Sequence, residues 1–115
     1  MTAVKGHGYQ IEKHFYKTAD DYINCVFRIP GPKDTQKDRT SNRPVIVIQH
    51  GMNDSCQFAM NEGADSLALI LAESGYDVWL NNARGNLYSR SHKYLDPDYD
   101  EQYWDFSFVE LGKYD

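Results

Sequence analysis

The sequence lacks any apolar run that could cross a membrane. Its longest uninterrupted apolar stretch, Leu67 to Ala72, is far shorter than the roughly 20 residues that a membrane-spanning helix needs. The first residues, Met1 to Gly6, contain no apolar core of signal-peptide length. We therefore expect a soluble chain, with no transmembrane segment and no signal peptide within it.

Cysteine is scarce, and there is no excess of positive charge. Cys25 and Cys56 are too few for a secreted disulfide scaffold and lack metal-ligand spacing, so we interpret both as small buried hydrophobes. A single bridge between them remains an open alternative. The 12 Lys and Arg residues are scattered among 17 Asp and Glu residues, for a net charge of −5. A nucleic-acid binder needs a concentrated basic surface, so we exclude nucleic acid as a partner.

The chain is organised around the stretch from Arg43 to Met52. The four β-branched residues Val45–Ile48 stand between Pro44 and Gly51 and predict a short strand buried on both faces, as in the middle of a parallel sheet. Open α/β sheets bind ligands at the carboxyl ends of such strands, and Gly51 allows the backbone to approach a substrate closely. The N–H of Met52, directly after that glycine, is the candidate donor to a developing negative charge.

Two further strands precede this stretch. Gln10–Lys17 and Tyr22–Ile29 show partial alternation and are separated by a short polar turn, which predicts a β-hairpin. Pro30 and Pro32 end the second strand, because neither can donate a hydrogen bond to a sheet. The polar residues Lys33–Asn42 should form a solvated surface loop.

A helix and a strand follow the central stretch. Asp65–Gly75 supplies a cap residue, a run of good helix formers and a glycine just past the end. The helix is apolar on more than one side, so it should lie against the sheet and also beneath another element. Tyr76–Leu80 follows without a linker, which predicts a right-handed βαβ unit with parallel strands.

The last third of the sequence alternates between loop and helix signals. Asn81–Asp100 is polar and punctuated, and a long loop in a compact domain is usually functional. Glu101–Leu111 resumes helical spacing, with Asp98 or Asp100 as the expected cap. The predicted helix places Trp104, Phe108 and Leu111 on one face.

We expect structural roles for the histidines. His50 could act as a base, but no nucleophile is visible within its reach, so we favour a role in holding the turn by ring hydrogen bonds. His7 and His14 are too far apart for a helical metal pair, and His92 lies in a polar loop, so we expect surface residues there. No metal site and no cofactor are predicted.

Arg84 follows the carboxyl end of a predicted strand, where its side chain could contact a substrate. An arginine in this position more often pins a loop by hydrogen bonds. We favour the anchoring interpretation and keep substrate contact as the alternative.

Short matches to one known family recur in order along nearly the whole chain. They are Gly8-Tyr9 with Glu12, Thr18 through Tyr22, Arg28-Ile29-Pro30, Arg43-Pro44-Val45 with Gln49-His50-Gly51, Ser66-Leu67-Ala68, Ala72 through Leu80, Asn82, Arg84-Gly85-Asn86, Trp104 with Phe106-Ser107-Phe108, and Lys113-Tyr114-Asp115. On these residues the chain resembles the N-terminal part of the acid lipase family, the α/β-hydrolases that include the gastric and lysosomal acid lipases.

The resemblance implies the fold class, which is α/β with a partial α/β-hydrolase fold. Residues 1–115 would form the N-terminal portion of the lipase domain, truncated before the nucleophile elbow. The hairpin and the βαβ unit would share one mixed sheet, with the strands in the order first, second, fourth, third. In the family the strand that carries the nucleophile pairs with the third strand, so Val45–Ile48 should form an open edge here.

The resemblance also implies a site. In the family the His-Gly turn after the third strand supplies half of an oxyanion hole, which assigns this role to the Met52 backbone N–H on the turn of His50 and Gly51. The family has leucine in place of Met52 and a second apolar residue in place of Asn53. The polar Asn53 makes the lining unusual, and Asn53 and Arg84 are the candidate substrate contacts.

The catalytic residues themselves are missing. The family's nucleophile lies in a G-x-S-x-G elbow, and its acid and histidine follow later in the sequence. None of the seven serines here has glycine two positions to each side. Ala64–Ala68 comes closest, but no strand precedes it, so we assign Ser66 to the start of a helix. We expect the nucleophile, acid and base outside this chain.

Three interpretations of function follow. We favour a fragment of a lipase that hydrolyses acylglycerol or steryl esters. The second is a half-enzyme that needs a separate C-terminal complementing chain. The third is a noncatalytic remnant that serves as an interaction or scaffold subunit of a larger assembly, which the polar Asn53 favours slightly. Members of the family are often secreted or lysosomal.

Overall fold

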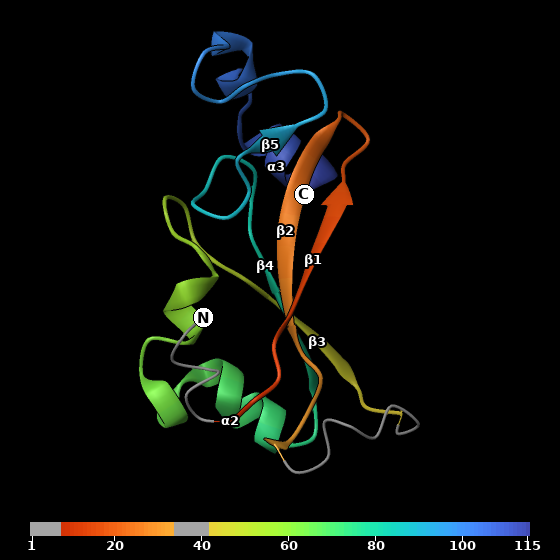
Figure 1. The fold of residues 1–115 in the computed structure, drawn as a ribbon, viewed down its shortest axis with the longest axis vertical. Helices are drawn as coiled ribbons and strands as arrows, with labels where there is room; N and C mark the ends of the chain where they lie inside the picture. Colours follow the sequence, from red (N-terminus) through yellow and green to blue (C-terminus); the bar gives the residue numbers. More distant parts are fainter. Residues whose placement is uncertain (1–7, 34–41) are drawn as a thin grey trace.

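A computed structural model describes residues 8–33 and 42–115 (Figure 1). Its sheet has the strand order β1-β2-β4-β3, formed by β1 (Glu12–Lys17), β2 (Tyr22–Ile29), β4 (Asp77–Asn81) and β3 (Val45–Gln49). β2 is antiparallel to both β1 and β4, whereas β3 is parallel to β4. The predicted hairpin, mixed sheet and strand order are therefore confirmed. Most of the predicted loop 33–42, and His7, lie outside the described residues.

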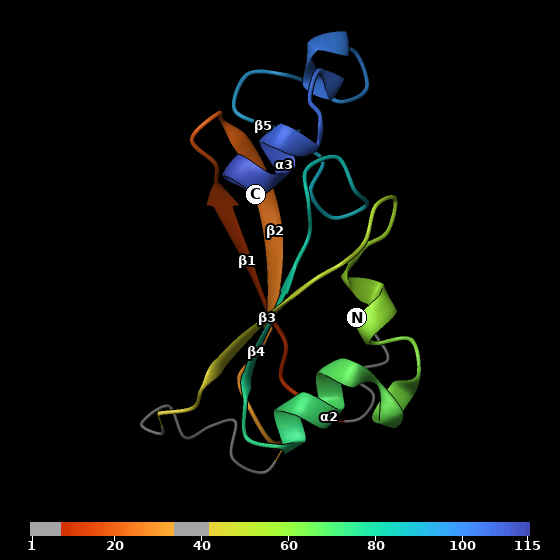
Figure 2. The same cartoon turned by 180° about the vertical axis from the view of Figure 1, so that it is seen from behind.

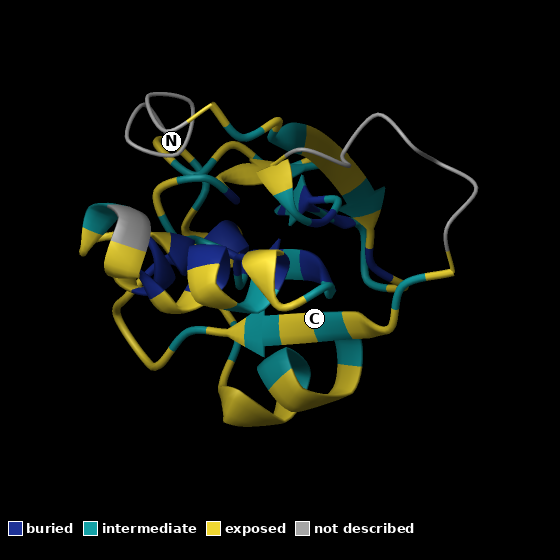
Figure 3. Ribbon diagram, turned by 90° about the horizontal axis from the view of Figure 1, so that it is seen from below, coloured by how far each residue is buried: buried dark blue, intermediate teal, exposed yellow. Residues whose placement is uncertain are grey.

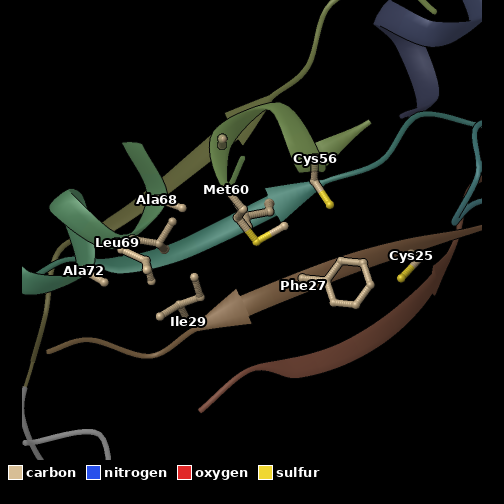
Figure 4. Close-up of a cluster of buried hydrophobic side chains, with 11 residues drawn as sticks. Cys25, Phe27, Ile29, Cys56, Met60, Ala68, Leu69 and Ala72 are labelled. Atoms are coloured by element: carbon tan, nitrogen blue, oxygen red, sulfur yellow. The ribbon is translucent and has the colours of Figure 1, made fainter. Parts of the chain in front are cut away.

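The core fills the space between one face of the sheet and α2 (Leu67–Glu73). Figure 4 shows Leu69 and Ala72 of α2 on the side of the sheet where Phe27 and Ile29 of β2 lie, with Met60 between the two layers. Figure 3 shows the buried residues gathered in this interior, with exposed residues around it. Burying each large apolar side chain stabilises the fold by about 1.5 to 3 kcal/mol.

Both cysteines belong to this core, as predicted. Cys25 lies on β2 and Cys56 at the start of the short helix η2 (Cys56–Ala59), and both are free and fully buried. Burial raises the pKa of both thiols, because the thiolate loses its hydration. The two residues therefore act as small hydrophobes in the described structure.

The ends of α2 agree with the sequence only in part. Gly75 adopts φ +99°, and the N–H groups of Gly75 and Tyr76 donate to the carbonyls of Ala72 and Leu71, which closes the helix as a Schellman motif. The helix was expected from Asp65, but Asp65 belongs to the short helix η3 (Gly63–Asp65) and α2 begins at Leu67. Ser66 takes the N-cap position, but its side chain makes no capping hydrogen bond.

The second apolar side of α2 is not covered by the described residues. Leu67 and Ile70 remain 48% and 51% exposed. The expectation that α2 lies beneath another element is therefore wrong for this part of the chain. The second apolar side of a helix is buried only where another element packs against it.

The prediction that β3 is buried on both faces is also wrong. Val45 and Val47 are 62% and 63% exposed, whereas Ile46 and Ile48 are half-buried against the core. Successive side chains of a strand point to opposite faces, and β3 is the last strand in the sheet order. The expected open edge is confirmed, since no described strand pairs with the outer side of β3.

We expect this edge to make the 115-residue chain self-associate or to leave it marginally stable. The opposite edge, β1, carries Lys13 and Lys17 among its charged residues, whereas Val45–Ile48 offers no charge against pairing with another strand. Val47→Lys should therefore shift the chain toward monomer in sedimentation experiments. Val109→Lys is the matched control, because Val109 is equally exposed but lies away from this edge.

Hydrogen exchange tests the same edge directly. The Val45–Ile48 amides on the outer side should exchange quickly unless another strand covers them. A monodisperse monomer in which these amides are strongly protected would show that the edge is already covered.

The end of the chain departs most from the predicted helix over Glu101–Leu111. Glu101–Trp104 forms the short helix η4, the chain then extends, and α3 runs from Phe108 to Tyr114. Ser107 starts α3 with a capping box, in which its hydroxyl accepts from the Val109 N–H and Glu110 accepts from the Ser107 N–H. Asp100, one of the two expected cap residues, takes the N-cap position of η4, but its side chain makes no capping hydrogen bond.

The loop after β4 contains one short strand that the sequence did not predict, β5 (Ser91–His92), which pairs with β2. His92 is half-buried rather than a surface residue. Its Nδ1 accepts from the N–H groups of Tyr94 and Leu95, and its ring meets the Tyr22 ring edge-on at 4.6 Å between centroids. Figures 1 and 2 place β5 and α3 at one end of the sheet and α2 at the other. No described helix is long and apolar enough to span a membrane.

Candidate functional site

A cavity of about 760 Å³ lies at the carboxyl ends of β3 and β4. Its lining comes from the turn Gln49–Asp54 after β3, the loop Ala83–Asn86 after β4, and residues between Trp104 and Asp115. Its volume lies within the range of about 300 to 1,000 Å³ that is usual for small-molecule sites. The position agrees with the expectation that ligands bind where the parallel strands end.

His50 holds the turn after β3 with its ring, as the sequence predicted. Its Nε2 accepts a hydrogen bond from the Ala83 N–H at 3.0 Å and lies 3.1 Å from Nδ2 of Asn86. An Nε2 that accepts leaves the proton on Nδ1, which donates to the Gly51 carbonyl oxygen at 2.7 Å. The neutral imidazole therefore links the turn after β3 to the loop after β4.

The backbone beyond His50 opens toward the cavity. A Cβ added to Gly51 would meet no described atom within 4 Å, and Gly51 does not have positive φ. Asn53 takes the left-handed conformation instead, with φ 60°. Glycine at position 51 therefore leaves open space beside the turn without being required by the backbone conformation.

Met52, whose N–H the sequence singles out as a donor, lies on the lining of the cavity. Within residues 8–33 and 42–115 this N–H donates to no protein acceptor, and Met52 is 69% exposed on the cavity lining. Asn53 also lines the cavity and is exposed. These two positions lie where the sequence expected them, and their roles in binding stay predictions.

Asn82 and Asn86 are structural residues of the site that reasoning from sequence pattern alone did not single out. The buried Asn82 accepts from the Cys56 N–H at 3.0 Å and from Nδ2 of Asn86 at 2.9 Å, and donates to the Cys25 carbonyl. Asn86 in turn accepts from the N–H groups of Tyr88 and Ser89. The only signal in the sequence was the pair of asparagines at positions 81 and 82, at the end of an apolar strand.

Arg84 anchors three segments from a fully buried position. Its Nη1 donates to Asp20 at 2.6 Å, and its Nε and Nη2 donate to Asp115 at 2.9 and 2.8 Å. The guanidinium also lies 3.9 Å from the centroid of the Tyr22 ring. These contacts agree with the anchoring interpretation, because they tie the hairpin turn, the loop after β4 and the residue after α3 together.

The same contacts set the charges of the cluster. Burial works to raise the pKa of Asp20, but hydrogen bonds from Arg84 and Thr18 lower it overall. Burial likewise works to lower the pKa of Arg84, and the hydrogen bonds to Asp20 and Asp115 raise it. Arg84 therefore pairs with two carboxyl groups at once, those of Asp20 and Asp115.

The serine on the lining is already committed to a structural role. Ser107 Oγ lies 2.7 Å from Glu110 Oε2 and caps α3. Ser66, the closest match to an elbow, has a buried hydroxyl without a hydrogen-bond partner and does not line the cavity. Among the described residues no serine hydroxyl bonds to a histidine ring, and no group of three His, Cys, Asp or Glu side chains could hold a metal ion.

Comparison with known proteins agrees with this architecture. The family described as a partial α/β-hydrolase lipase region matches residues 1–62. The chain is 43% identical over 110 residues to a probable lipase of Schizosaccharomyces pombe. It is 42% identical over 109 residues to the lysosomal acid lipase/cholesteryl ester hydrolase of Homo sapiens, and 44% identical over 109 residues to the gastric triacylglycerol lipase of Bos taurus.

Each of these three alignments covers 94% of this chain but only 24% to 27% of the relative. The chain therefore spans about a quarter of the length of the relatives it matches. The family match covers more than half of the chain, and the observed sheet has the strand order expected for a hydrolase. On these grounds the chain belongs to the acid lipase family of α/β-hydrolases.

Proposed function

We propose that this chain supplies half of the oxyanion hole, and part of the substrate cavity, of an enzyme that hydrolyses acylglycerol or steryl esters. The observation that carries the proposal is the Met52 N–H, which has no protein acceptor among the described residues and belongs to a residue that lines the cavity. A donor positioned before the reaction can stabilise the oxyanion of a tetrahedral intermediate without reorganising. The nucleophile, acid and base are then supplied by residues outside these 115.

The surrounding contacts support the assignment. The oxyanion donor must keep its direction while charge develops, and the imidazole of His50 ties the adjacent Gly51 carbonyl to the Ala83 N–H. Asn86 and Asn82 hold the other side of this connection in the buried interior. The turn that precedes Met52 is thus braced from the loop after β4.

The test begins with the protein as its source cells make it. Native protein captured with an antibody against these residues should hydrolyse a long-chain ester. A serine-directed phosphonate should label a serine outside the 115-residue sequence, on a longer polypeptide or on a co-purifying chain. Captured material that hydrolyses no ester and takes up no label would contradict the proposal and favour the noncatalytic scaffold, which the exposed polar Asn53 favours slightly.

Met52→Pro should lower kcat of that active enzyme by about 10²- to 10³-fold, because proline removes the single N–H that the proposal uses. Met52→Leu is the matched control, since it keeps the N–H and an apolar side chain of similar size. The measurement is steady-state hydrolysis by both variants. Equal activity of the proline and leucine variants would show that this amide is not an oxyanion donor.

A further inference from the structure

The turn after β3 brings two further polar side chains to the cavity lining. Asn53 and Asp54 directly follow Met52, and both are exposed. The lining also includes polar side chains that already bond to protein groups, namely Gln49, His50, Arg84, Asn86, Ser107 and Asp115. Among the described residues, the hydrogen-bonding capacity left for a ligand therefore gathers at the turn that holds Met52.

The amide of Asn53 is unused within the protein. It makes no hydrogen bond to any residue within 8–33 and 42–115. Asn53 has φ 60°, a left-handed conformation that asparagine tolerates better than most residues. The backbone thus explains why asparagine fits here, but it gives the side chain no partner in the described part of the chain. The amide can therefore donate to a ligand and accept from it.

The carboxylate of Asp54 is held at one oxygen and open at the other. Its Oδ1 accepts from the Ser55 N–H at 2.7 Å. Ser55 is buried, and its hydroxyl accepts from the Gln57 N–H at 3.3 Å, which anchors this segment at the start of η2. No Lys, Arg or His of the described ranges pairs with Asp54. Its Oδ2 can therefore accept a hydrogen bond from a ligand.

These two side chains suit a ligand that carries hydroxyl groups. A hydroxyl can donate to the Asp54 carboxylate or accept from the Asn53 amide, and a diol can do both at once. A triacylglycerol or a steryl ester has no hydroxyl on its alcohol part. Its binding would remove water from both side chains without replacing the lost hydrogen bonds, and such a loss discriminates between substrates.

From this arrangement we infer that Asn53 and Asp54 select an ester whose alcohol part carries free hydroxyl groups, as a monoacylglycerol does. The inference rests on the proposed function, which places the ester carbonyl at the neighbouring Met52 N–H. In a monoacylglycerol the hydroxyls lie on the carbons that follow the ester oxygen. The two residues that follow Met52 are therefore the ones that meet them.

The experiment compares two esters on protein captured from source cells that express the wild-type chain or a variant. Monodecanoylglycerol has free hydroxyls, whereas propyl decanoate has the same acyl chain and a three-carbon alcohol without them. Asn53→Leu should lower the ratio of kcat/KM for monodecanoylglycerol to that for propyl decanoate by about two- to tenfold, because it removes a hydrogen bond to a hydroxyl. Asp54→Asn should also lower this ratio, because a neutral amide oxygen is a weaker acceptor than a carboxylate.

Asn61→Leu is the matched control for this ratio. Asn61 is also an exposed asparagine, but it lies outside the described lining of the cavity, so the ratio should not change. Equal shifts of the ratio in the two leucine variants would overturn the inference. So would an equal loss on both esters in Asn53→Leu, which would assign Asn53 a structural role in the turn.

A binding measurement separates this inference from the proposed function. The ether 1-O-decylglycerol has the same hydroxyls as the monoacylglycerol and cannot be hydrolysed. In equilibrium dialysis the captured protein should bind it more tightly than decyl propyl ether, and Asn53→Leu, but not Asn61→Leu, should reduce that difference. If the difference appears while no ester is hydrolysed, only the proposed function is refuted. If esters are hydrolysed and Asn53→Leu changes neither the ratio nor the difference in binding, only this inference is refuted.

Discussion

The purified 115-residue chain should hydrolyse short nitrophenyl esters no faster than background. The transition state would find one oxyanion donor, on Met52, and no activated nucleophile. In comparable serine hydrolases the Ser-His-Asp unit contributes about a millionfold to the rate. The chain alone should therefore lack nearly all of the rate enhancement that the Ser-His-Asp unit provides.

The described hydroxyls explain why no substitute nucleophile is expected. Ser89 Oγ is buried, donates to the Asn82 carbonyl and accepts from the Cys25 N–H. Ser107 Oγ belongs to the capping box of α3. The His50 ring, which would have to act as base, already uses Nε2 to accept from the Ala83 N–H. Turnover that a serine-directed phosphonate abolishes, with the label on any of the seven serines of this chain, would contradict the prediction.

Replacing Arg84 by methionine should lower the free energy of unfolding by about 3 to 5 kcal/mol, because the substitution strands two partly or fully buried carboxylates. The Asp115 side chain is only 4% exposed and that of Asp20 is 28% exposed, so water cannot fully replace the lost guanidinium. Domains are typically stable by only about 5 to 15 kcal/mol. Urea unfolding of the variant should therefore show a large part of the stability removed.

A matched control separates burial from charge. Arg90 pairs with Asp98 at 2.9 Å, but its side chain is 40% exposed and that of Asp98 is 69% exposed. Arg90→Met should therefore change stability by no more than about 1 kcal/mol. Arg84→Lys should fall between the two, since lysine keeps the charge but cannot bridge two carboxylates with a planar fork. If Arg84→Met unfolds at the same urea concentration as Arg90→Met, the buried cluster is not an anchor.

Only part of the site could be predicted from the sequence pattern. The His50-Gly51 turn could be predicted, because a β-branched run that stops at a His-Gly pair leaves a backbone amide at the end of a strand. The bracing by Asn82 and Asn86 could not, because asparagine after a strand fits many loops, and only the fold brings Cys25 and Cys56 to the two ends of one amide side chain. The ion pairs of the aspartates at positions 20 and 115 could not be predicted either, because only the fold places Arg84 between them.

Several features followed from the sequence by itself, because they depend on neighbouring residues. Local periodicity and backbone preference predict three of them: the hairpin of Tyr22–Ile29 and its partner strand, the parallel pair β3 and β4, and the helix end at Gly75. Only the tertiary structure decided what each apolar side faces. Val47 lies exposed at a sheet edge despite a sequence typical of a buried strand, because burial depends on which element lies next to it, and that element need not be a neighbour in the chain. The predicted helix containing Trp104 and Phe108 gives a second case. Trp104 ends η4 and Phe108 begins α3, which Ser107 caps, yet both side chains line the same cavity.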